Sequence, residues 1–119
     1  MIYLALSEHI FEKVKEILEK HNLKYEKIED GEQLLELAKK DPPDLIILEK
    51  DIPLLDGFSV TLILKSNIKT EEIPILVVCK ADYKEEIIKA KDCGSDNIIK
   101  YPFKEEELLQ KIKELLERS

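Results

Sequence analysis

The sequence is poor in several residue types, and each shortage narrows the possible functions. Arg118 is the only arginine, and 26 acidic residues against 19 basic ones give a net charge of −7. Because nucleic-acid binding depends on clustered Lys and Arg, we expect no nucleic-acid partner for this domain. Cys79 and Cys93 are the only cysteines, far apart and without a neighbouring histidine. They therefore indicate buried thiols rather than a metal site or a disulfide.

Long apolar runs and glycine-rich loops are also missing. No stretch approaches the length of a membrane span, so we expect no membrane partner. The N-terminus lacks the basic region and long apolar stretch of a signal peptide, which favours a cytoplasmic location. Gly31, Gly57 and Gly94 are the only glycines. None forms a phosphate-binding glycine-rich loop after a strand, which argues against a small-ligand binder.

What is present is an alternation of short apolar runs and longer amphipathic segments. The chain has 119 residues, of which 44% are hydrophobic, enough for one domain over residues 1–119. The predicted strands are Ile2–Leu6, Lys24–Ile28, Asp44–Leu48, Ile73–Cys79 and Asn97–Lys100. Most are continuously apolar, as expected for strands that are covered on both faces.

The segments between these runs have helical periodicity. Ser7 is the predicted N-cap of a first helix whose inward residues are Ile10, Val14, Ile17 and Leu18. Further helices are predicted at Gly31–Lys40, Gly57–Ser66, Lys84–Cys93 and Lys104–Glu117. Five strands alternating with five helices predict an α/β fold with a parallel sheet. Chemistry in such folds lies at the carboxyl ends of the strands.

Several motifs, in this order along the chain, resemble the receiver domains of response regulators. Pro43-Asp-Leu-Ile-Ile-Leu-Glu49 followed by Pro53-Leu-Leu-Asp-Gly-Phe58 is similar to the third strand of a receiver and its loop. Further matches are Asp30-Gly31, Ile73-Pro74, Gly94-Ser-Asp96 and Pro102-Phe103. The resemblance covers the whole chain. It implies a flavodoxin-like, doubly wound five-stranded parallel sheet with five helices and strand order 2-1-3-4-5.

The resemblance also implies a phosphorylation site, in which a sensor kinase transfers a phosphoryl group to an aspartate. The phosphoacceptor position holds Glu49 in this chain. The other key positions are Ala5 and Leu6 for the acidic pair that binds a metal, Cys79 for the hydroxyl residue, Tyr101 for the lysine and Ile98 for the aromatic switch residue. None of these positions keeps its usual residue, so the site resembles that of a degenerate receiver.

The leading hypothesis is therefore a signalling module of two-component type that acts by protein–protein contact without phosphorylation. We expect no catalytic residue, no bound metal and no cofactor, because Ala5 and Leu6 offer no oxygen ligands for Mg²⁺. The expected partner is a sensor kinase, an effector domain or a second copy. A phosphoacceptor domain with an atypical site at Asp51 or Glu49 is one alternative. A flavodoxin-like small-ligand binder is the other.

Local expectations follow from the same positions. Glu49 is either a built-in mimic of the phosphorylated state or an ordinary carboxylate, exposed or hydrogen-bonded to Tyr101. The Tyr101 ring is expected to pack over Ala5 and Leu6, and the Tyr101–Pro102 bond to be cis, as is common in receivers. Leu62 and Ile63 are predicted to point outward from their helix. They form either a partner surface or isolated exposed apolar residues.

Overall fold

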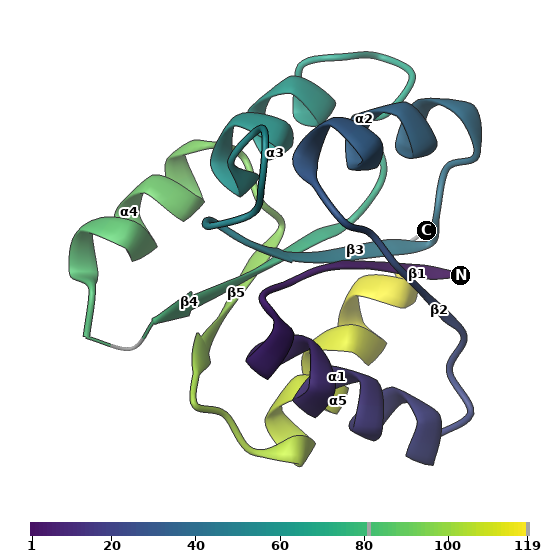
Figure 1. Cartoon of the computed structure of the whole chain (residues 1–119), viewed down its shortest axis with the longest axis vertical. Helices are drawn as coiled ribbons and strands as arrows, with labels where there is room; N and C mark the ends of the chain where they lie inside the picture. The colour runs from purple at the N-terminus through teal and green to yellow at the C-terminus, as the bar shows by residue number, and fades with distance from the viewer. Residues whose placement is uncertain (81, 119) are drawn as a thin grey trace.

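The computed structural model describes residues 1–80 and 82–118, which form a central sheet covered by helices on both faces (Figure 1). The described elements are β1 (Ile2–Ala5), α1 (Glu8–Lys20), β2 (Tyr25–Lys27), α2 (Gly31–Lys40), β3 (Leu45–Glu49), α3 (Gly57–Lys65), β4 (Ile75–Lys80), α4 (Lys84–Asp92), β5 (Asn97–Tyr101) and α5 (Glu105–Leu116). These bounds agree with the predicted ones to within about two residues at most ends, the usual scatter of helix and strand termini.

The sheet has the order β2-β1-β3-β4-β5, and all four strand pairs are parallel. This confirms the predicted fold class and strand order. The register places Ala5 beside Leu48, and Glu49 beside Val78. Because all strands run in one direction, their carboxyl ends meet at a single edge of the sheet.

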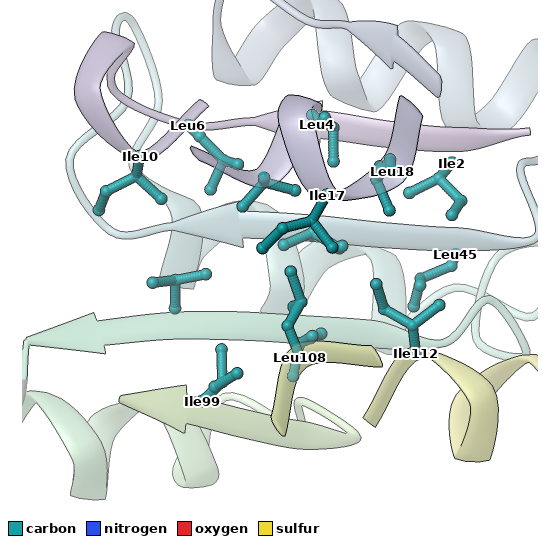
Figure 2. Packing of buried hydrophobic residues seen from close by; sticks show 14 of the residues in the cluster. Ile2, Leu4, Leu6, Ile10, Ile17, Leu18, Leu45, Ile99, Leu108 and Ile112 are labelled. Carbon is teal, nitrogen blue, oxygen red and sulfur yellow. The ribbon is translucent and has the colours of Figure 1, made fainter. Parts of the chain in front are cut away.

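The alternation of side chains along each strand divides the core into two clusters. Ile2, Leu45 and Ile99 belong to the cluster under α1 and α5, part of which is shown in Figure 2. Tyr3 and Ile46, their neighbours in sequence, belong to the cluster under α2, α3 and α4. Strands that are apolar at every position are therefore buried from both sides, as the continuous apolar runs predicted.

Side-chain caps fix the start of two helices. The Asp30 carboxylate accepts a hydrogen bond from the Gln33 N–H at 2.8 Å, and Asp56 accepts from Phe58 and Ser59, each at 3.0 Å. Partial burial raises the pKa of Asp56, but the hydrogen bonds from Ser59 and Phe58 outweigh it and hold the pKa below its ordinary value. Ser7 is the N-cap residue of α1, as predicted, but its side chain makes no capping hydrogen bond.

Helix α3 packs on the sheet through Val60, Thr61 and Leu64, which are buried. Phe58 is only half-buried, because it lies at the flank toward α4 and lines a small depression there. Leu62 and Ile63 point outward, with 54% and 39% of their surface exposed, as predicted.

An ion-pair network ties the amino edge of the sheet together. Lys65 at the end of α3 contacts Asp96 at 2.6 Å, and both side chains are about 15% exposed. The same carboxylate accepts the Ile75 N–H at 2.8 Å and contacts Arg118 at 3.3 Å. Lys65 also donates to the Ile73 carbonyl at 2.6 Å. One carboxylate therefore joins α3, β4, β5 and the end of α5.

Replacing Asp96 should therefore destabilise the fold. We expect Asp96→Ala to lower the free energy of unfolding by about 3 kcal/mol, because it leaves the largely buried Lys65 ammonium without its counter-charge. Urea denaturation followed by circular dichroism measures this change. Asp44→Ala is the matched control: Asp44 pairs with the N-terminal ammonium at an exposed site, and its loss should cost less than about 1 kcal/mol. Equal losses in the two variants would contradict a special role for Asp96.

Candidate functional site

Glu49 ends β3 at the carboxyl edge of the sheet. Its side chain is on the α1/α5 face, since it follows Leu45 and Ile47 at alternate positions of the strand. Glu49 is 6% exposed, and its Oε1 accepts a hydrogen bond from the Ser7 N–H. The expectation that Glu49 would be exposed or bonded to Tyr101 was therefore wrong. The carboxylate meets the backbone just before α1, while the Tyr101 hydroxyl group lies against His9.

The backbone of Glu49 also positions α3. A Cβ atom placed on Gly57 would lie 2.2 Å from the Glu49 carbonyl oxygen, so only glycine fits at this point. The Gly57 N–H donates to the Lys50 carbonyl at 2.9 Å and closes the loop after β3. Helices α1 and α3 therefore both start against the same residue, one through its carboxylate and the other through its main chain.

Tyr101 turns toward α1 rather than toward Glu49. Its hydroxyl group lies 2.7 Å from His9 Nε2, and the two rings meet edge to face at 5.8 Å between centroids. The Phe103 ring packs edge to face on its other side at 5.7 Å. The Tyr101–Pro102 bond is cis, as predicted. The Tyr101 ring packs against the cluster that contains Leu6, whereas Ala5 belongs to the cluster on the other face of the sheet. The prediction that the ring packs over Ala5 was therefore wrong, and its packing over Leu6 stays a prediction.

The predicted metal-binding positions provide no ligands. Ala5 is fully buried and Leu6 is 8% exposed, and both are apolar. Glu8 is the nearest carboxylate in the sequence, and it is paired with Lys27 at 3.2 Å. Over residues 1–80 and 82–118, no three His, Cys, Asp or Glu side chains converge to hold a metal ion. The residues present do not fit the Mg²⁺ ion that receiver domains use.

The two switch positions on β4 and β5 lie under α4. Cys79 is 1% exposed, and Ile98 is half-buried against the same cluster. Burial raises the pKa of Cys79 to about 12, with smaller contributions from Glu86 and Cys93. Cys93 is also buried, as predicted, and its pKa is raised mainly by burial. Cys79 and Glu49 lie on opposite faces of the sheet, so the thiol and the carboxylate do not converge.

Two contacts at this edge were not predicted from the sequence. Ser7 was predicted only as a helix N-cap and not as a partner of Glu49, and His9 was not paired with Tyr101. Both contacts join residues more than 40 positions apart, at 42 and 92 residues of separation. The sequence did contain one signal for these contacts, the apolar residues Ala5 and Leu6 at positions that are acidic in the family. Without charged neighbours there, the Glu49 carboxylate and the Tyr101 hydroxyl group need other hydrogen-bond partners.

This geometry defines a flavodoxin-like α/β fold with its candidate site at the carboxyl ends of β1, β3, β4 and β5. A sequence profile of the response regulator receiver domain matches residues 7–113, so the chain belongs to the receiver domain family of response regulators. Among the described residues, no helix combines the length and apolar character of a membrane span.

Relatives and solved structures support this assignment. The chain is 38% identical over 90 residues to the response regulator MprA of Mycobacterium leprae, covering 76% of this chain and 39% of that protein. It therefore spans about two-fifths of the length of the curated relatives that it matches. A putative response regulator from Chloroflexus aurantiacus has the same fold, with a TM-score of 0.91 at 21% identity over 97% of this chain and 95% of that one. The receiver domain of a histidine kinase from Syntrophus aciditrophicus superposes with a TM-score of 0.89 at 26% identity, over 98% of this chain and 89% of that one.

The raised pKa of Cys79 predicts slow alkylation. An ordinary thiol has a pKa near 9.0, and a value of about 12 leaves roughly a thousandfold less thiolate at pH 8. We expect a Cys93→Ser variant to react with iodoacetamide at least about a hundredfold more slowly when folded than in urea. Mass spectrometry follows the reaction. Because the folded protein holds the Cys79 thiol proton more tightly than the unfolded chain does, the raised pKa contributes to the stability of the fold. This contribution is present below pH 9 and is lost as the pH rises toward 12. Equal rates in the two states would show that the thiol is accessible.

Because Ala5 and Leu6 offer no oxygen ligands, we predict no specific divalent metal site at this edge. Mn²⁺ titration followed by paramagnetic broadening should leave the amide signals of Ser7 and Glu49 unaffected at sub-millimolar metal. The matched variant is Ala5→Asp combined with Leu6→Asp, which supplies the missing carboxylates. Broadening centred on Glu49 in the unmodified chain would contradict the prediction.

Proposed function

We propose that this receiver domain signals through protein–protein contacts that do not depend on phosphorylation. The observation that carries the proposal is the state of Glu49, which we assign to the phosphoacceptor position: it is 6% exposed, and its Oε1 accepts a hydrogen bond from the Ser7 N–H. A phosphoryl donor must approach a carboxylate oxygen in line with the leaving group. The low exposure of the side chain and the hydrogen bond at Oε1 both disfavour that approach.

The electrostatics at the site support the same proposal. Phosphoryl transfer needs positive charge to offset the charge that builds on the equatorial oxygens. We assign the metal-binding positions to Ala5 and Leu6 and the lysine position to Tyr101, and none of these side chains carries a positive charge or binds a cation. The nearby Lys100 is the neighbour of Tyr101 on a regular strand, so its side chain points to the opposite face. Lys100 is therefore not positioned to replace the lysine of the family.

The mimic interpretation of Glu49 receives less support. A mimic of the phosphorylated state should engage the side chains at the switch positions, which we assign to Cys79, Ile98 and Tyr101. Instead the carboxylate engages the start of α1, Cys79 lies on the opposite face, and Tyr101 bonds to His9. In this arrangement the Glu49 carboxylate stabilises the start of α1 and does not imitate a phosphoryl group.

The alternative phosphoacceptor, Asp51, is disfavoured by the bounds of β3. Strand β3 ends at Glu49, and its register with β1 and β4 is regular up to that end. Asp51 lies two residues further, in the exposed loop, so a slip that moved it to the strand end would break this register.

The proposed module is not an enzyme and takes no cofactor. Its expected setting is the cytoplasm, and its expected partners are a kinase, an effector domain or a second copy.

A labelling series with acetyl phosphate and Mg²⁺ tests the proposal. We expect no phosphorylation of the unmodified chain or of Glu49→Asp, because neither restores the cation site. Combining Glu49→Asp with Ala5→Asp, Leu6→Asp and Tyr101→Lys should permit Mg²⁺-dependent labelling, measured as an 80 Da mass increase. Thermal melting of each variant checks that it is folded. Rapid labelling of Glu49→Asp alone, or of Asp51 in the unmodified chain, would overturn the proposal.

A further inference from the structure

The outer face of α3 is uncharged in a chain of which 38% of the residues are charged. Helix α3 lies beside α2 on one side of the sheet (Figure 1). The residues from Gly57 to Leu64 are all uncharged, and Lys65, which follows them, is paired with Asp96. The neighbours Leu62 and Ile63 are both exposed on this face. Apolar side chains that are exposed together, rather than singly, are typical of a contact surface.

The residues of this face are arranged symmetrically about its midpoint. Ser59 lies three residues before Leu62, and Ser66 lies three residues after Ile63. All four lie along one face of the helix, because their spacing matches the helical repeat. When a second copy of the helix runs antiparallel across the midpoint, Leu62 of each copy meets Ile63 of the other, and each Ser59 meets a Ser66. The small serines allow the helix axes to approach, so that the larger side chains can pack between them.

The charges at the two ends of α3 favour the same antiparallel arrangement. Asp56, the N-cap residue, is exposed at the amino end of the helix, and Lys69 is exposed in the turn that follows its carboxyl end. An antiparallel pair brings the acidic end of each helix to the basic end of the other, and it opposes the two helix dipoles. A parallel pair would place like charges together.

Charge also favours a second copy of this chain as the occupant of this face. The chain has a net charge of −7, so two copies repel each other over most of their surface. The repulsion is smallest where a face is itself uncharged and carries opposite charges at its two ends. Two-fold pairing uses the same patch on both copies, so the patch must be complementary to itself. The outer face of α3 meets both conditions.

The exposed apolar residue of α4 does not meet them. Ile88 is 58% exposed, which is close to the 54% of Leu62. Its helix, however, carries charged residues in every turn from Lys84 to Asp92. Two copies of such a helix would have to bring several charges together in the contact, which costs hydration.

We propose that the domain forms a two-fold dimer in which the α3 helices of the two copies pack antiparallel. Leu62 and Ile63 form the apolar centre of the contact, and Asp56 of each copy lies near Lys69 of the other. Two short helices bury less area than a permanent interface, so the dimer is weak, with a dissociation constant on the order of 100 µM. The inference rests on the proposed function, since the contact requires no phosphorylation.

Sedimentation velocity over a concentration series, without Mg²⁺ or acetyl phosphate, tests the inference. The weight-average mass should rise from one chain at about 10 µM toward two chains at about 1 mM. Leu62→Glu places a carboxylate from each copy in the apolar centre and should weaken association at least about tenfold. Because Leu62 is exposed in the single chain, this change preserves the fold, which thermal melting checks.

A mixture of two variants tests the antiparallel register. In a dimer of one Leu62→Glu chain and one Ile63→Lys chain, the new carboxylate meets the new ammonium, whereas in either variant alone it meets an apolar side chain. The mixture should therefore associate at least about fivefold more tightly than either variant alone. The matched control mixes Leu62→Glu with Leu62→Lys, which supplies the same charges at positions that are not opposite each other, and it should gain less.

A further pair of variants tests the charges at the ends of the helices. Lys69→Glu sets a second carboxylate near Asp56 of the other copy and should weaken association about threefold at low salt. Lys113→Glu makes the same change in net charge at an exposed position on α5 and should leave association unchanged. Equal effects of the two variants would show that only net charge matters.

Several outcomes would overturn the inference. A chain that stays monomeric at about 1 mM would leave the face of α3 to a different protein. Association that is unchanged by Leu62→Glu, or amide shifts on dilution at Ile88 instead of Leu62, would place the contact elsewhere. A larger gain in the control mixture would show that the helices pack in parallel. None of these results bears on acetyl phosphate labelling, so a failure here is distinguishable from a failure of the proposed function.

Discussion

The backbone pairing of β3 is the constraint on which the rest of the structure depends. This strand pairs with β1 on one side and β4 on the other, and all five of its residues are buried. Its alternating side chains contribute to both core clusters, so its register decides which residues lie under α1 and α5 and which lie under α3 and α4. The same register fixes the direction of the last side chain, Glu49, and therefore the character of the carboxyl edge.

Burial of Glu49 needs compensation, because a carboxylate loses hydration when it leaves water. The N–H at the start of α1 provides it, and the partial positive charge at a helix N-terminus favours an anion there. A Mg²⁺ ion and a lysine would provide the same compensation in a working receiver, through charges that a phosphoryl group can share. Here the compensation comes from a backbone group, the Ser7 N–H, which joins β3 to the start of α1.

The two edges of the sheet are stabilised by different kinds of contact. At the amino edge, ion pairs join the elements. The Asp96 carboxylate pairs with Lys65 and Arg118 and accepts a hydrogen bond from the Ile75 N–H. At the carboxyl edge, the contacts include the hydrogen bond and ring contact between Tyr101 and His9, the ring contact between Tyr101 and Phe103, and the bond from the Ser7 N–H to the Glu49 carboxylate.

The sequence by itself determined the alternation of strands and helices, and its resemblance to receiver domains gave the strand order and the positions to compare with the family's site. Short continuous apolar runs that alternate with amphipathic segments indicate strands covered on both faces. The identities of Ala5, Leu6, Cys79 and Tyr101 are read directly from the chain. Only the tertiary structure decided where Glu49 and Tyr101 find their partners. Those partners, Ser7 and His9, lie 42 and 92 residues away, and several donors at that edge were chemically acceptable. Side-chain type limits what a residue can bind, but the packing of distant elements decides which partner lies within reach.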